Sequence, residues 1–186
     1  MVNTIKSPIV VLFLLAVLAS TPRAQMVYVG TVSLYADSLW STSEAFDTGP
    51  GILTVYVVHD NNPTGDPHSA IWFKIEAAVG FTGVWITESS PHPTVVGTSP
   101  SGIAIGYAGP CVATPVHVLT ITYALSGTSA PNSYIEVVAN PDASSGLIET
   151  VPCVGFINYC DGGRLTINPT VPAGRTTWGQ IKATYR

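Results

Sequence analysis

Apolar and polar side chains alternate along several short segments of this chain. In residues 70–77 apolar side chains occupy every second position, and a tryptophan and two charged residues stand between them. Successive side chains of a β-strand point to opposite faces of a sheet, so this pattern predicts a strand with one buried face. Segments that are apolar on both faces predict central strands. The side chains expected on buried faces are Ile71, Phe73, Ile75, Ala77, Leu53, Val55, Val57, Leu119, Ile121 and Tyr123.

About ten such segments occur, each bounded by Gly, Pro, Asn or Asp, as is typical of strands joined by turns. No convincing helical period lies between them. The pattern therefore predicts an all-β fold in which antiparallel sheets pack face to face as a β-sandwich. The expected strands are residues 27–35, 52–59, 70–77, 83–87, 94–97, 103–107, 116–125, 134–138, 147–153 and 164–167.

The N-terminus has the pattern of a secretory signal peptide. Residues 9–19 are apolar and uncharged but too short to span a membrane as a helix. Cleavage is expected after Ala24 or, less favoured, after Ala19, and the alternative is an uncleaved membrane anchor. The C-terminal tail is interpreted either as a segment that docks or frays or as a tag recognised by another component. The expected organisation is a signal peptide at 1–24, a β-sandwich domain at 25–169, and a linker with C-terminal tail at 170–186.

The chain is acidic and poor in charge. Charged residues make up 10% of its 186 residues, against roughly 25% in an average soluble domain. The formal net charge is −4 at pH 7, and loss of Lys6 and Arg23 with the signal peptide would make the mature chain more acidic. No basic surface is available for nucleic acid, which is therefore not expected as a partner. No later stretch predicts a membrane span after signal cleavage.

Three cysteines would enter an oxidising compartment, where pairing of two is favoured. A bond between Cys111 and Cys153 is preferred, because it would close a long loop and restrict the unfolded chain most. A bond between Cys153 and Cys160 is the alternative. None of the three has a spacing to histidine that suits zinc.

Residues 59–68 resemble the start of a calcium loop, with Asp60, Asn62 and Asp66 as candidate ligands. The resemblance stops at the twelfth position, which is Ile71 where a helix-loop-helix calcium site needs a carboxylate. A polar hairpin loop is the preferred interpretation. Zinc held by two loop histidines and an aspartate ranks lower. No metal or other cofactor is therefore expected.

Catalytic patterns are also weak. The serines are scattered through turns without a nucleophile elbow, and the glutamates fall one to a strand region. His117 is expected to share a face with Leu119 and Ile121 as a half-buried histidine. The sequence therefore predicts a protein that is not an enzyme.

Two tryptophans alternate out of phase with the apolar residues beside them. Trp72 lies between Ile71 and Phe73, and Trp85 has apolar neighbours of the same kind. If both face outward on neighbouring strands, they could form with Tyr56 a flat aromatic platform that stacks on sugar rings. The alternative is that the other face is covered and both indoles are ordinary packing.

Four segments, residues 51–58, 70–75, 102–107 and 118–123, together resemble a cohesin-like or carbohydrate-binding-module-like sandwich. This resemblance implies an Ig-like or cohesin-like jelly roll. The mature chain also resembles a group of uncharacterised secreted bacterial proteins, which implies an extracellular location and the same fold. That group has a further cysteine near Asn132, and this chain has none, so the resemblance leaves the disulfide pairing open. The segments that carry the second resemblance are residues 115–121, 141–142, 145–148, 162–169 and 177–182.

These observations predict a secreted, non-catalytic binding or structural module of the cell surface or of an extracellular assembly. Its partner would be another extracellular protein or a polysaccharide. A carbohydrate-binding module that uses Trp72, Trp85 and Tyr56 is the alternative function. A secreted hydrolase is the third class considered.

Overall fold

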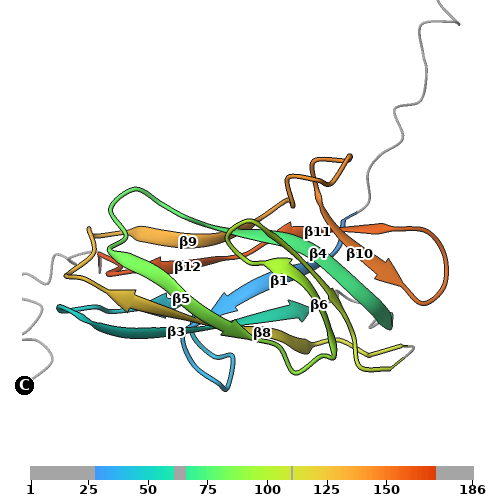
Figure 1. The fold of residues 1–186 in the computed structure, drawn as a ribbon, viewed down its shortest axis with the longest axis horizontal. Coiled ribbons are helices and arrows are strands. Elements are labelled where there is room, and N and C mark those ends of the chain that lie inside the picture. Colours follow the sequence, from blue (N-terminus) through green and yellow to red (C-terminus); the bar gives the residue numbers. More distant parts are fainter. Residues whose placement is uncertain (1–27, 61–65, 110, 171–186) are drawn as a thin grey trace, which may run out of the picture.

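The computed structural model describes residues 28–60, 66–109 and 111–170, and within them every regular element is a β-strand. Figure 1 shows these strands running roughly along the long axis of the molecule. The all-β prediction is confirmed, with twelve strands in place of about ten. The strands are β1 (Tyr28–Tyr35), β2 (Glu44–Ala45), β3 (Gly51–Asp60), β4 (His68–Ala77), β5 (Gly83–Ser89), β6 (Thr94–Thr98), β7 (Gly102–Gly106), β8 (Val116–Leu125), β9 (Ser133–Val138), β10 (Ile148–Pro152), β11 (Asn158–Gly162) and β12 (Arg164–Ile167).

The strands form a β-sandwich whose two layers we call sheet one and sheet two. Sheet one has the order β5-β8-β3-β1-β11, and sheet two has the order β6-β7-β4-β9-β12-β2. Strand β10 pairs with both β4 and β11 and so links the sheets at one side. Most pairs are antiparallel, as expected, but β1 with β11 and β2 with β12 are parallel.

The core lies between the two sheets and follows the predicted alternation. Ile71, Phe73 and Ile75 of β4 are buried, whereas Trp72 is only half-buried. The buried positions predicted on β8 are also confirmed. Ala77 departs from the prediction, because β4 ends there and its side chain is exposed.

A β-bulge changes the outward face of sheet one. The register between β3 and β8 shifts between Val57 and Val58, so that Val57 pairs with Leu119 and Val58 pairs with His117. The extra residue, Val118, is fully buried. His117 therefore points away from the core instead of sharing a face with Leu119, because one extra residue reverses the alternation.

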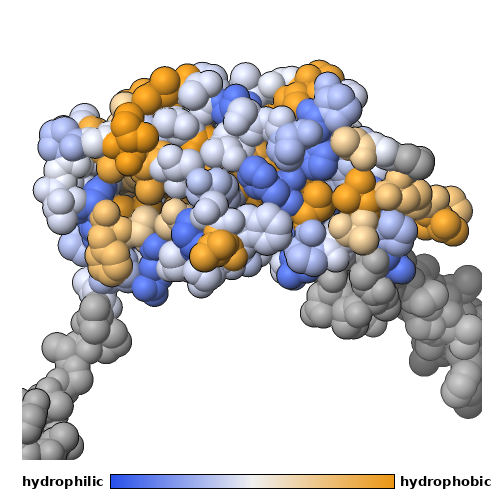
Figure 2. Space-filling model, turned by 90° about the horizontal axis from the view of Figure 1, so that it is seen from below, coloured by the Kyte–Doolittle hydropathy of each residue, from blue (hydrophilic) through white to orange (hydrophobic). Residues whose placement is uncertain are grey.

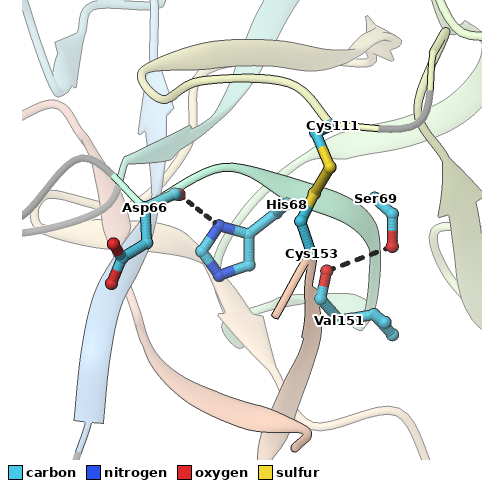
Figure 3. The surroundings of a disulfide bond; sticks show 6 residues. All are labelled: Asp66, His68, Ser69, Cys111, Val151 and Cys153. Carbon is cyan, nitrogen blue, oxygen red and sulfur yellow. Dashed lines mark hydrogen bonds between the residues drawn. A yellow bond between two sulfur atoms is a disulfide. The ribbon is translucent and has the colours of Figure 1, made fainter. Parts of the chain in front are cut away.

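A disulfide joins Cys111 to Cys153, which are 42 residues apart, and Cys160 is a buried free thiol. The preferred pairing is confirmed and the alternative, Cys153 with Cys160, is wrong. Figure 3 shows the bond beside His68, whose Nδ1 donates to the backbone oxygen of Asp66 at 2.8 Å. The bond ties the segment before β8 to the end of β10.

The described residues contain no helix with the length and hydropathy that a membrane crossing requires. The predicted signal peptide at 1–24 and almost all of the predicted tail at 170–186 lie outside the described residues. Both stay predictions.

Candidate functional site

An apolar groove of about 230 Å³ opens on the outer face of sheet two. Strand pairing places Trp72 at its centre, with Ala104 of β7 on one side and Glu149 of β10 on the other. Ala104 in turn pairs with Val96 of β6. The two small side chains of the lining, Ala70 and Ala104, leave room beside the large indole. Its lining residues are Ala70, Ile71, Trp72, Ala104, Glu149, Val151 and Ile157.

The rim of this groove carries exposed apolar side chains. Val96, which pairs with Ala104, is 66% exposed, and Ile157 of the lining is 53% exposed. Phe156, which precedes Ile157 in the connection between β10 and β11, is 93% exposed. Apolar side chains gathered at one place on a surface mark sites of interaction more often than single ones do. Figure 2 shows the molecule from below, where exposed hydrophobic side chains are interspersed with polar ones.

The domain around the groove is strongly acidic. The described residues include all 11 carboxylates of the chain but only two of its 7 lysines and arginines. Those two, Lys74 and Arg164, form salt bridges with Glu76 and Glu136 at 2.7 and 2.8 Å. Glu149 at the groove accepts a hydrogen bond from the Ser145 hydroxyl at 2.6 Å. The field at the groove therefore favours a cationic partner over an anionic one.

The aromatic platform expected from the sequence is not assembled. Trp72 lies on β4 in sheet two, whereas Tyr56 and Trp85 lie on β3 and β5 in sheet one. Trp85 is also oriented against the prediction, since its indole packs on the core and its two apolar neighbours are exposed. Burial of one indole removes more apolar area from water than burial of either neighbour, and Glu88 accepts its Nε1–H at 3.2 Å.

Tyr56 instead belongs to a row of three rings on the outer face of sheet one. Its ring centroid lies 5.8 Å from that of His117, and the His117 centroid lies 6.3 Å from that of Trp40. The sequence pattern missed two members of this row. Trp40 lies in the connection between β1 and β2 without any strand pattern, and His117 is turned outward by the bulge.

The overall architecture matches solved cohesin modules. A cohesin module from a family 33 glycoside hydrolase of Clostridium perfringens aligns over 77% of this chain and 99% of its own length, with 8% identity and a TM-score of 0.51. Two cohesins of Clostridium thermocellum, Coh-OlpC and Coh-OlpA, were solved as cohesin–dockerin complexes with Doc435 and Doc918. They align over 78% and 75% of this chain and 97% and 99% of their own lengths. Their identities are 7% and 12%, and both TM-scores are 0.50. The domain is a cohesin-like β-sandwich. No protein-family model and no curated protein matches the chain.

The weak calcium candidate between β3 and β4 is only partly described. Asp60 ends β3 and Asp66 precedes β4, but Asn62 lies outside the described residues. Within the described ranges, no group of three or more His, Cys, Asp or Glu side chains is arranged to hold a metal ion. Neither the weak calcium candidate nor the preferred polar hairpin loop is therefore tested.

The interior of the cohesin-like sandwich contains a cysteine next to a histidine. The Sγ atom of Cys160 lies 3.6 Å from Nε2 of His59, and Nδ1 of His59 lies 2.7 Å from the Tyr107 hydroxyl. Burial raises the pKa of Cys160 to about 12, and burial also lowers the pKa of His59 to about 3. A nucleophilic cysteine needs a thiolate and access to substrate. This neutral, enclosed pair has neither.

Proposed function

We propose that this protein is a secreted, non-catalytic module that docks another protein in the groove around Trp72 and so joins it to an extracellular assembly. The groove is the observation that carries this proposal. It places a half-buried indole between Ala104 and Glu149, beside exposed apolar side chains. Aromatic side chains at the centre of well-packed apolar patches are the residues that dominate binding energy in protein interfaces.

The comparisons support a protein as the class of partner. Two of the similar structures are cohesins solved as complexes with dockerins, so this architecture serves elsewhere as a protein-docking module. For this chain we propose a protein segment with an apolar anchor side chain for the groove and with flanking lysines or arginines. The flanking cations would meet Glu149 and the other carboxylates of the domain.

Secretion belongs to the same proposal. The apolar N-terminal run supports export, and the disulfide between Cys111 and Cys153 suits an oxidising compartment. A partner outside the cell follows from export. Mass spectrometry of the mature protein from the culture medium of the producing organism should give an N-terminus at Gln25 or, after the less favoured cleavage, at Ser20.

Site-specific photocrosslinking tests the docking face. A photoreactive residue at Val96 lies on the groove rim, and one at Ile52 is the matched control, because the two positions are 66% and 65% exposed on different sheets. In the culture medium of the producing organism, the probe at Val96 should capture a protein that the probe at Ile52 does not. That protein is then identified, purified and titrated against the full secreted chain.

The titration decides the proposal. Trp72→Ala should weaken binding about thirtyfold, the effect of losing an aromatic hot spot. Ala104→Arg should block the groove, whereas Ala124→Arg, a half-buried alanine on the outer face of sheet one, should bind as the wild type does. Capture at Ile52 alone, or full affinity in both Trp72→Ala and Ala104→Arg, would overturn docking in the groove.

A further inference from the structure

The outer face of sheet one is neutral and rich in hydroxyl groups. We call it the neutral face and define it by the outward side chains of β1, β3, β8 and β5 together with Trp40 and His117. Strand pairing arranges its side chains in rows. The rows are Ile52, Ala124 and Val84, then Thr54, Thr122 and Thr87, then Tyr35, Tyr56, Thr120 and Ser89.

None of the side chains in these described rows carries a charge, although the described domain holds 11 carboxylates. Glu88 of β5 is directed away from the neutral face, because its carboxylate accepts hydrogen bonds from the Trp85 indole and from the backbone N–H of Ser99. Asp60 lies beyond the rows, at the end of β3. A surface without charge inside an acidic domain suits a neutral ligand, since an anionic ligand would be repelled by the surroundings.

The ring row of Trp40, His117 and Tyr56 crosses this face. His117 is fixed between the other two rings, because its Nε2–H donates to the backbone oxygen of Leu119 at 3.0 Å. Both Tyr56 and Trp40 are half-buried and so keep part of their surface open to solvent. The row therefore offers aromatic surface at two points, with threonine hydroxyls beside it.

Trp40 is held in an unfavourable backbone conformation. Its φ of 57° lies in the left-handed region, which is a strained position for a bulky side chain. The loop that carries it is closed by Asp37, whose carboxylate accepts hydrogen bonds from the backbone N–H groups of Leu39, Ser41 and Thr42 and from the Ser41 hydroxyl. Strain of this kind persists where the surroundings enforce it, and here it places an indole next to His117.

We propose that the neutral face binds an uncharged polysaccharide chain, with sugar rings stacked on Trp40 and Tyr56. The apolar faces of pyranose rings would cover the aromatic surfaces, and the threonine rows would exchange hydrogen bonds with the sugar hydroxyls. This site lies on the opposite sheet from the groove around Trp72 and is independent of protein docking. The protein would thereby hold a polysaccharide and a protein partner at the same time.

Binding of the full secreted chain to cellulose, chitin, mannan and a β-1,3-glucan tests this site, with alginate as the anionic comparison. The wild type should bind at least one neutral polysaccharide and not alginate. Tyr56→Ala and Trp40→Asn should each weaken that binding about tenfold or more. Asparagine is chosen at position 40 because it tolerates the left-handed backbone and replaces the indole by a small amide. Thermal unfolding of each variant checks that the fold is kept.

Three controls separate this site from the groove. Tyr56→Phe keeps the ring and should bind within about twofold of the wild type, since stacking uses the ring face. Trp72→Ala should bind the polysaccharide normally. The proposal would be overturned by no binding to any of the four neutral polysaccharides, by binding to alginate alone, or by full binding in both Tyr56→Ala and Trp40→Asn. None of these outcomes would contradict protein docking in the groove.

Discussion

Each end of β3 lies beside a buried polar cluster, and one cluster is charged whereas the other is neutral. Asp47, four residues before β3, shares one cluster with Ser129 and Asn168, and its carboxylate is ionised. His59, next to the last residue of β3, shares the other cluster with Tyr107 and Cys160, whose groups are neutral. The comparison shows which surroundings allow a charge inside the same sandwich.

The Asp47 end keeps its charge because hydrogen-bond donors surround the carboxylate. It accepts from the Ser129 N–H at 2.9 Å, from the Ser129 hydroxyl at 2.5 Å and from the Asn168 amide at 2.6 Å. Burial alone would raise the pKa of Asp47, but the hydrogen bonds from Ser129 and Asn168 outweigh it and lower the pKa below 3.8. Charge-assisted hydrogen bonds of this kind compensate for desolvation.

At the His59 end burial keeps the groups neutral. Burial, with a contribution from His68, lowers the pKa of His59 to about 3, and burial raises the pKa of Cys160 to about 12 and that of Tyr107 well above its usual value. Stability there comes from apolar packing and from a covalent bond. His68 pairs through its backbone with Val112, the residue after Cys111 of the disulfide.

Among the variants proposed for the two ends of β3, removal of the disulfide should lower the free energy of unfolding most. The double variant Cys111→Ala with Cys153→Ala frees a loop whose ends are 42 residues apart, which corresponds to about 4 kcal/mol of unfolding free energy. Urea denaturation measures the loss. Cys160→Ala is the control and should cost less than half as much. Equal denaturation midpoints in the wild type and the double variant would show that the disulfide does not stabilise this end.

Asp47→Ala should be the next largest change, with a loss of about 3 kcal/mol, because buried donors on Ser129 and Asn168 lose their acceptor. The matched control is Asp142→Ala, since Asp142 is exposed and, within the described residues, only its backbone N–H forms a hydrogen bond. Its cost should stay within about 0.5 kcal/mol. A comparable loss in both variants would mean that the Asp47 cluster is not a special source of stability.

The stabilising contributions of the two ends of β3 should be lost in different pH ranges. The folded pKa of His59 is about 3, below the ordinary 6.5, so its stabilising effect is complete above pH 6.5 and is lost as the pH falls toward 3. The loss for one such group is about 1.4 kcal/mol per pH unit. Asp47, with its pKa below 3.8, loses its contribution only at lower pH. Between pH 6.5 and 4.5 the histidine end alone should weaken.

Urea denaturation at a series of pH values measures that slope. His59→Gln should lower the slope of unfolding free energy against pH by the contribution of about one proton. Part of the slope should remain, because the pKa values of His68 and His92 are also lowered. Asp47→Asn should leave the slope above pH 4.5 unchanged. If His59→Gln and the wild type lose stability in parallel, the assignment of acid sensitivity to His59 is wrong.

Local pattern was enough to predict the core and the disulfide. The alternation around Ile71, Phe73 and Ile75 reports burial directly, because strand geometry fixes which side chains share a face. The pairing of Cys111 with Cys153 followed from loop length. Both inferences use only neighbours in sequence or the length of chain between two residues.

The candidate sites depend on features that the local pattern does not carry. The bulge at Val118 turned His117 outward, and β5 packs Trp85 on the core in place of its β-branched neighbours. Trp40 reached the neutral face through a strained loop conformation that gives no periodic signal. Strand neighbours come from long-range pairing, so the sequence could not place Trp72 and Trp85 on different sheets.

Tyr107→Phe should have the smallest effect and is the finest probe of the neutral end. It removes one hydrogen bond, that between the Tyr107 hydroxyl and His59 Nδ1 at 2.7 Å, and keeps the buried ring. A neutral hydrogen bond contributes about 1 kcal/mol, so the loss should be roughly a third of that for Asp47→Ala. Tyr56→Phe, on the outer face, is the matched control with an expected change near zero. If Tyr107→Phe destabilised the protein as much as Asp47→Ala, the His59 end would depend on its polar contacts as strongly as the charged end does.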